Sequence, residues 1–293
     1  MKYDFRTERT KGRVQINIGE WQSPDSDLIH IYRMNGKAHV TYITKACYVG
    51  EEVNGVQKGD SLLLSKVACD VATTPFASYK IEENSYFDVP EEQIMGVFSN
   101  NKINIDSLRM RWKNVLFKKI EKRQNSTLVI EEKNTMIGEI VKVGEDSSLK
   151  IGDLIAVGDN VSTPVEIAGG NYFAVEEKFI VGVLQKDLQI ENMKIINEYV
   201  LMKSYIAKNV LNSTVLETSG IDYDYLDYSD INNRNLFKVE YADRSLGNIK
   251  KGDIILLDRN YTNYMYYNNE KYFVINDKKW ILGKIIERDK QCN

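Results

Sequence analysis

The chain has 293 residues, of which 43% are hydrophobic and 28% charged. This balance excludes an intrinsically disordered protein and gives enough apolar surface for more than one core. Lys and Arg total 39 against 42 Asp and Glu, so nucleic acid is not expected to be the main partner. Only 2 His and 3 Cys are present, which leaves little of the usual equipment for catalysis or transition-metal binding.

Residues 1–11 are polar and charged, and we expect them to form an N-terminal arm that is disordered alone and ordered on a partner. They contain no apolar core of a secretory signal. No uncharged apolar stretch of the chain approaches the roughly 20 residues that a spanning helix needs, so no membrane partner is expected.

Three segments of the chain share two landmarks in the same order. The first landmark is a Gly-Asp dipeptide followed by an apolar run, at Gly59-Asp60, Gly152-Asp153 and Gly252-Asp253. The second is an apolar strand with a central glycine, at Gly96, Gly182 and Gly283. In each Gly-Asp pair, glycine is expected to supply the positive φ of a turn that leads into a buried strand. The chain therefore contains an internal repeat.

Between these landmarks, short β-branched and aromatic runs alternate with Gly, Asn, Asp and Ser clusters, which is typical of small sandwiches or barrels. The sequence predicts an all-β fold of three tandem small β-barrels, each of ordinary domain size. The predicted parts are the arm at 1–11, barrels at 12–105, 106–190 and 191–293, and a Tyr/Asp-rich insert near 221–230.

The second repeat resembles the co-chaperonin GroES. A strand at 114–119 precedes a polar loop with an apolar triplet at 128–130, and then the segment 138–144. The Gly-Asp turn at 151–153 and a closing strand within 174–184 complete the order of a GroES-type barrel. Because the turn and the closing strand recur in the other repeats, the resemblance extends over most of the chain.

In the GroES family, a mobile loop with an apolar triplet docks into a groove on the chaperonin ring. The resemblance gives this partner-binding role to Leu128, Val129 and Ile130, and to Val215 and Leu216 in the near copy of the third repeat. The residues leave an alternative open, because a short loop rich in β-branched residues also suits an ordered strand or hairpin.

The insert at 221–230 carries Tyr223, Tyr225 and Tyr228 among aspartates. We expect it to form an acidic, aromatic surface loop that contacts a protein, because tyrosine offers contact area at low entropic cost. Calcium binding by the aspartates is the alternative, although the spacing of an EF-hand is absent.

A second tyrosine-dense segment, at 261–273, alternates in the way that predicts a β-hairpin. Its Tyr264 and Tyr266 either face a protein partner or pack across the hairpin. The basic run at 109–113 is expected to be a solvated strand end, with phosphate contact as the alternative.

An enzyme is not expected, and no cofactor is predicted. His30, His39 and Cys47 are interpreted as strand residues rather than as a metal site. The sequence also has no Gly-x-Ser-x-Gly elbow, P-loop or HExxH motif.

These features predict a non-enzymatic assembly protein that binds other protein subunits through loops and strand edges. Abundant Asn, Ile, Lys and Tyr are typical of AT-rich coding, as in many phage genomes. The first expectation is therefore a phage virion component, either an auxiliary capsid or a head–tail protein, found in the virion and the host cytoplasm. The alternative is a diverged cytoplasmic co-chaperonin that caps a chaperonin ring through its apolar loops.

Overall fold

A computed structural model describes the chain in thirteen segments separated by gaps. The described residues are 11–17, 32–34, 37–39, 42–68, 79–81, 84–99, 102–120, 136–158, 161–205, 214–218, 236–258, 264–267 and 270–287. The arm predicted at 1–11 therefore lies almost entirely outside the described residues, as does the Tyr/Asp-rich insert at 221–230.

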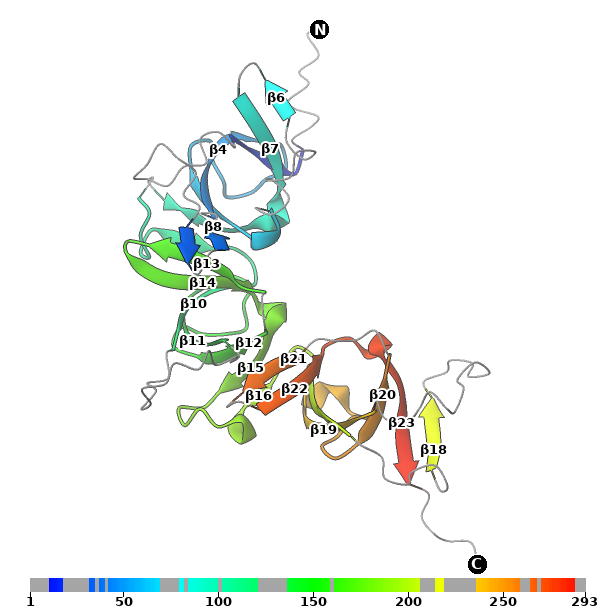
Figure 1. Cartoon of the computed structure of the whole chain (residues 1–293). Helices are drawn as coiled ribbons and strands as arrows, with labels where there is room; N and C mark the ends of the chain where they lie inside the picture. Colours follow the sequence, from blue (N-terminus) through cyan, green and yellow to red (C-terminus); the bar gives the residue numbers. More distant parts are fainter. Residues whose placement is uncertain are drawn as a thin grey trace, which may run out of the picture. The chain divides into compact units, whose positions relative to one another are not determined.

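The protein is all-β, as predicted, and its three seven-stranded sheets follow one another along the chain (Figure 1). The first sheet contains β1 (Arg13–Asn17), β4 (Ile43–Val49), β5 (Ser61–Leu64), β6 (Tyr79–Ile81), β7 (Asn84–Pro90), β8 (Ile94–Phe98) and β9 (Leu108–Met110). The second contains β10 (Asn114–Lys119), β11 (Met136–Val143), β12 (Leu154–Val157), β13 (Thr163–Ile167), β14 (Gly170–Glu176), β15 (Ile180–Leu184) and β16 (Lys194–Ile195). The third contains β17 (Val200–Ser204), β18 (Thr214–Thr218), β19 (Leu236–Ala242), β20 (Ile254–Leu257), β21 (Tyr264–Tyr267), β22 (Glu270–Ile275) and β23 (Ile281–Glu287).

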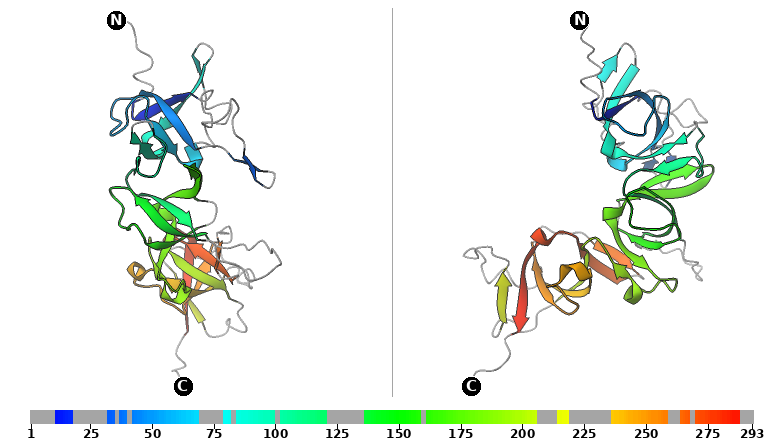
Figure 2. Two further views of the ribbon diagram at one scale, coloured as in Figure 1. Left: turned by 90° about the vertical axis from the view of Figure 1, so that its left-hand side faces the viewer. Right: turned by 180° about the vertical axis from the view of Figure 1, so that it is seen from behind.

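Shorter elements connect these strands. A separate two-stranded sheet pairs β2 (Tyr32–Met34) with β3 (Lys37–His39). The 3-10 turns are η1 (Glu91–Gln93), η3 (Glu177–Phe179), η4 (Ile190–Asn192), η6 (Arg244–Leu246) and η7 (Lys278–Trp280). Of these, η1, η3 and η7 each come directly before the closing strand of a sheet, which is β8, β15 or β23. In two further views, the strands of the first and third sheets curve around their own interiors (Figure 2).

All three sheets have the same strand order. Their orders are β6-β7-β1-β4-β5-β8-β9, β13-β14-β10-β11-β12-β15-β16 and β21-β22-β17-β19-β20-β23-β18. Each thus runs from a hairpin, through the first, second and third strands of the repeat, to the closing strand and one flanking strand. The flanking strands β9 and β16 follow their closing strands in the sequence, whereas β18 comes from an earlier segment of its own repeat. The repeat in the sequence is therefore a repeat in the structure.

The three sheets also share a register irregularity. The first strand of each repeat pairs with the second strand, and the register shifts after the second paired residue. The shifts fall between residues 15 and 16, 116 and 117, and 201 and 202. Since a bulge bends a strand and increases its twist, the shared shift curves each sheet at the same place.

The Gly-Asp turns are built identically, and the prediction of positive φ at their glycines is confirmed. The φ values are 91° at Gly59, 90° at Gly152 and 93° at Gly252. In the second turn, the amide of Gly152 donates to Ile140 O (2.9 Å), and the amide of Ile140 donates to Asp153 O (3.0 Å). The same two hydrogen bonds join each of the other turns to its own second strand.

The aspartate of each Gly-Asp pair closes its turn through its side chain. Asp153 Oδ2 accepts from the amide of Lys150 at 2.8 Å, and the corresponding distances at Asp60 and Asp253 are both 2.7 Å. We expect Asp153→Ala to lower the free energy of unfolding by about 1 kcal/mol, because one local hydrogen bond to the backbone is lost. Asp253→Ala should cost more, since Asp253 also pairs with Lys284 Nζ at 2.9 Å. Urea unfolding measures both, and Glu145→Ala, at an exposed position, is the control.

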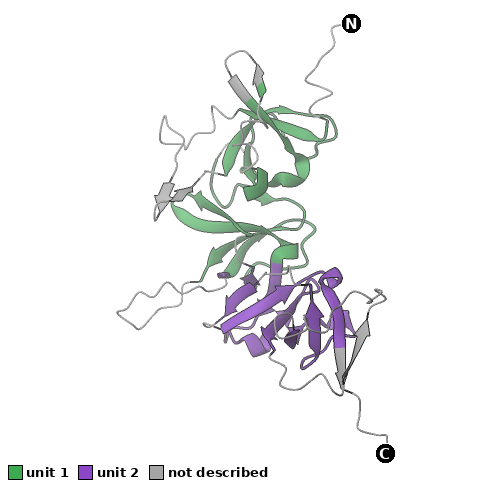
Figure 3. Ribbon diagram, turned by 45° about the vertical axis from the view of Figure 1, so that its right-hand side comes forward, with its two compact units in different colours: residues 1–121, 137–154, 160–179 green, residues 122–136, 155–159, 180–293 purple. Residues whose placement is uncertain are grey.

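The chain divides into two compact units (Figure 3). The first unit comprises residues 1–121, 137–154 and 160–179, and the second comprises 122–136, 155–159 and 180–293. In the first unit, the core of the first sheet continues into the second repeat through Leu116, Val165, Ile167 and Ala174. These four side chains are at most 7% exposed.

In the second unit, β17, β19, β20 and β22 enclose a core of their own. The side chains of Met202, Val239, Ile255 and Leu257 at its centre are inaccessible to solvent. Phe237 packs on Phe273 at a ring-centroid distance of 4.6 Å. Within the described residues, no helix is long and apolar enough to span a membrane.

Candidate functional site

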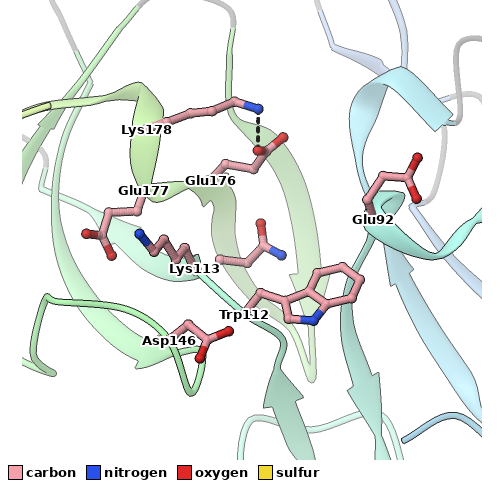
Figure 4. Close-up of a pocket in the computed structure, with 8 residues that line it drawn as sticks. Glu92, Trp112, Lys113, Asp146, Glu176, Glu177 and Lys178 are labelled. Atoms are coloured by element: carbon pink, nitrogen blue, oxygen red, sulfur yellow. Dashed lines mark ion pairs between the residues drawn. The ribbon is translucent and has the colours of Figure 1, made fainter. Parts of the chain in front are cut away.

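A pocket of about 410 Å³ lies beside the turn that connects β9 to β10. It is lined by residues 112–114 and 176–178, together with Glu92 and Asp146 (Figure 4). All of these residues belong to the first compact unit. The indole of Trp112 lies among the carboxylates of Glu92, Asp146 and Glu176 in this view.

Backbone hydrogen bonds hold the turn in place. The amide of Arg111 donates to Met95 O (2.9 Å), and the amide of Asn114 donates to Arg111 O (3.0 Å). The amide of Asp146 donates to Trp112 O at 3.1 Å, which fixes the loop after β11 against the turn. Trp112 has a φ of 51°, in the left-handed region, where a bulky side chain is strained.

A buried ion pair with Glu91 fixes the guanidinium of Arg111, which packs against the indole of Trp112. The Arg111 side chain is 3% exposed, and its Nη2 donates to Glu91 Oε1 (2.5 Å) and to Asn54 O (2.8 Å). Its guanidinium carbon lies 4.2 Å from the centroid of the Trp112 ring, a cation–π distance. The prediction that the run 109–113 is a solvated strand end is wrong for Arg111, because Glu91 neutralises its charge away from water.

Two carboxylates of the pocket have hydrogen-bond or ion-pair partners. Glu177 is 6% exposed and accepts hydrogen bonds from the hydroxyls of Ser147 and Ser148, both at 2.6 Å, and from the amide of Ser148 at 3.0 Å. Glu176 forms an ion pair with Lys178 at 2.5 Å. These two groups stabilise the wall of the pocket rather than leaving charge free for a ligand.

Other polar groups of the site have no partner in the described part of the chain. The exposed carboxylates of Glu92 and Asp146 form no ion pair or side-chain hydrogen bond there. The buried Asn114 Oδ1 and Arg111 Nη1 likewise lack a hydrogen-bond partner there, although each residue is only 3% exposed. A buried polar atom without a partner costs free energy, so the arrangement is not simply optimal packing.

Only one of the two predicted apolar docking segments lies within the described residues. Leu128, Val129 and Ile130 lie outside the described residues. Val215 and Leu216 lie in β18, where their backbones pair with Ile286 and Ile285 of β23. In the third repeat, the backbone of this segment therefore forms an ordered strand, which was the alternative to a docking loop.

The predicted hairpin at 261–273 is confirmed as two paired strands, β21 and β22. Tyr264 and Tyr266 share one face, with ring centroids 5.6 Å apart in an edge-to-face arrangement. Tyr264 is 40% exposed, and the ammonium of Lys271 lies 4.1 Å from its ring centroid. This tyrosine face thus combines accessible aromatic area with a positive charge. The other predicted contact tyrosines, Tyr223, Tyr225 and Tyr228, lie outside the described residues.

The opposite face of the hairpin is buried. Met265, Tyr267 and Tyr272 are at most 3% exposed, and the Tyr267 hydroxyl donates to Leu188 O at 2.6 Å. Alternation along β21 therefore separates a buried pair of side chains from an accessible pair. Tyr264 and Tyr266 thus lie on the face that is not buried, and their contact with a protein partner stays a prediction.

The free energy of unfolding should fall at alkaline pH, because a tyrosine of this buried face must stay protonated. Burial, followed by the carboxylates of Asp187 and Glu191, raises the pKa of Tyr267 to about 12, above the ordinary 10.0. Stability from the protonated phenol is fully present below pH 10 and is lost as the pH rises through 12. Between these values, the unfolding free energy of the wild type should fall by about 2 kcal/mol more than that of Tyr267→Phe. Urea unfolding across this pH range measures the difference, and equal slopes would contradict it.

The residues interpreted as strand residues rather than metal ligands are only partly within the described chain. Cys47 lies in β4, where its thiol donates to Lys45 O at 3.9 Å, and the backbone of His39 lies in β3, whereas His30 lies outside the described residues. Among described residues, no group of three His, Cys, Asp or Glu side chains is placed to hold a metal ion.

Sequence reasoning did not identify the pocket at Trp112. A usable signal was present, because the first connection between repeats contains Arg111 and Trp112, whereas the second contains Ile196 and Asn197. No protein-family model matches this chain, and no curated protein matches it significantly.

Proposed function

We propose that this protein is a non-enzymatic assembly component built from three tandem GroES-like barrels, and that it binds other protein subunits of a phage virion. The observation that carries the proposal is the threefold use of one sheet, with a common strand order, bulge and Gly-Asp turn. Tandem copies of one structural unit are typical of scaffolds that present surfaces to partners.

The tyrosine face of β21 supports a role in protein contacts. Tyr264 is exposed and Tyr266 partly exposed, and Lys271 adds a positive charge beside Tyr264. Aromatic side chains are enriched at the centres of protein interfaces, where they contribute much of the binding energy. This face is therefore the proposed contact for another subunit.

The proposal is tested by mass spectrometry of particles purified from the producing host. We expect the chain in the particles at a fixed ratio to the major capsid protein, and its presence only in particle-free lysate would overturn the virion assignment. Tyr264→Ser/Tyr266→Ser should reduce incorporation. The matched control is Pro164→Ser/Glu166→Ser, since β13 pairs with β14 in the register that joins β21 to β22.

A further inference from the structure

The two connections between consecutive repeats share backbone hydrogen bonds, which makes the second an internal reference for the first. In each, the residue after the flanking strand donates its amide to the closing strand: Arg111 to Met95 O at 2.9 Å, and Ile196 to Val181 O at 3.1 Å. The first strands of both repeats begin at matching places, as their shared bulge shows. Residues 111–114 therefore correspond to 196–199.

The first connection differs from the second in which residue is left-handed and in the polar atoms that it buries. The left-handed position is occupied by Asn197 (φ 57°) in the second connection and by Trp112 (φ 51°) in the first. Asparagine tolerates this region far better than tryptophan. In addition, Arg111 and Asn114 each bury a polar atom with no partner among the described residues, at positions where the other connection has Ile196 and Tyr199.

Strain and unsatisfied polar atoms that persist beside a pocket point to binding rather than to folding. The second connection has two left-handed residues of its own, Asn197 and Glu198, but no unpartnered buried side-chain atom among the described residues, so such a turn can be built without those atoms. Trp112 and Asn114 both line the pocket, and Arg111 holds the indole in place through its pair with Glu91. The unusual residues of the first connection thus converge on one cavity.

The chemistry of the pocket favours a cation. Its eight lining residues include four carboxylates and two lysines, and the carboxylates of Glu92 and Asp146 have no partner in the described part of the chain. Asn114 Oδ1 is a further unused acceptor, and the Trp112 indole offers an electron-rich face. A planar guanidinium suits this set best, because it stacks on aromatic rings and donates in several directions at once.

We infer that this pocket binds an arginine side chain of a protein partner. The inference rests on the proposed function, since a partner protein supplies the arginine. The positive charge of Arg111 does not oppose it, because Glu91 already neutralises that charge. The bound guanidinium contacts Trp112 and pairs with Glu92 and Asp146 at the rim.

The experiment is an NMR titration of the full chain with the peptide acetyl-Gly-Arg-Gly-amide, following the indole N–H signal of Trp112. That signal is assigned by its absence in Trp112→Asn. We expect a saturable shift that weakens with added salt, since an exposed charge pair is screened. A peptide with citrulline in place of arginine keeps the shape and removes the charge, so it should produce no saturable shift. An equal response to both peptides, or none to either, would overturn the inference.

Two variants connect the signal to the pocket. Glu92→Gln/Asp146→Asn changes exposed side chains only and should weaken arginine binding about tenfold. Trp112→Asn copies the second connection, so it should abolish the peptide-induced shifts of neighbouring amides without lowering the melting temperature. Unchanged affinity in the carboxylate variant would also contradict the inference. Because the titration needs no particle, its failure is distinguishable from the absence of the chain in virions.

Discussion

Replacing Gly144 with alanine is expected to lower the free energy of unfolding by about 3 kcal/mol. A Cβ atom at this position would lie 2.0 Å from Trp112 O and 2.7 Å from Arg111 O. Both oxygens belong to backbone held by hydrogen bonds, and the amide of Gly144 itself donates to Asn114 O at 2.8 Å. The clash is therefore relieved only if the turn before β10 moves.

Gly152→Ala is the matched control, because its cost has a different origin. A Cβ at Gly152 meets nothing within 4 Å, but its φ of 90° disfavours any side chain. We expect this variant to cost about 1 kcal/mol, from backbone strain alone. Urea unfolding of both proteins decides the matter: equal losses, or no loss for Gly144→Ala, would show that the steric account is incorrect.

In the third repeat, the position that corresponds to Gly144 is not a glycine. Asp243 takes the corresponding position, since its amide donates to Tyr199 O at 2.9 Å. Its carboxylate accepts from the amides of Glu198 (2.9 Å) and Ser245 (3.0 Å). A side chain is thus useful in that repeat. Gly144 is needed in the second repeat because the backbone around Trp112 occupies the space.

The repeat could be predicted from the sequence because its signals are local. A glycine that must adopt positive φ, an aspartate that closes the turn and an apolar run lie within a few residues, as at Gly152 and Asp153. The all-β class followed from the same short apolar runs. For strand β18, the sequence left a docking loop and an ordered strand both open, because its partner β23 lies far along the chain and its register depends on long-range pairing.

The site was harder to predict, because its residues come together only in the folded protein. Arg111 belongs to a basic run, and a charged run is normally solvated. Its burial depends on hydrogen bonds to Glu91 and Asn54, which are far from Arg111 in the sequence and meet it only in the fold. For β21, alternation correctly indicated two faces. The alternation does not reveal which of the tyrosines is buried, because Tyr267 bonds to Leu188 O, far away in the sequence.

Arg111→Met is expected to lower the free energy of unfolding by about 3 kcal/mol. Methionine keeps much of the apolar contact with Trp112, so the loss reports chiefly on the ion pair. Glu91, whose side chain is 18% exposed, would be left without its cation, and Asn54 O would lose a donor. The control is Lys203→Met, which breaks the solvent-exposed pair with Glu270 and should change little.

Adding Glu91→Gln to Arg111→Met separates the value of the ion pair from the penalty of breaking it. The double variant removes both charges and also the unpartnered Arg111 Nη1, so it should be more stable than Arg111→Met alone. A single variant no less stable than Lys203→Met would contradict the buried pairing. If the double variant has near wild-type stability, the ion pair adds little net stability to the fold. Its role would then be to hold the indole of Trp112 at the pocket.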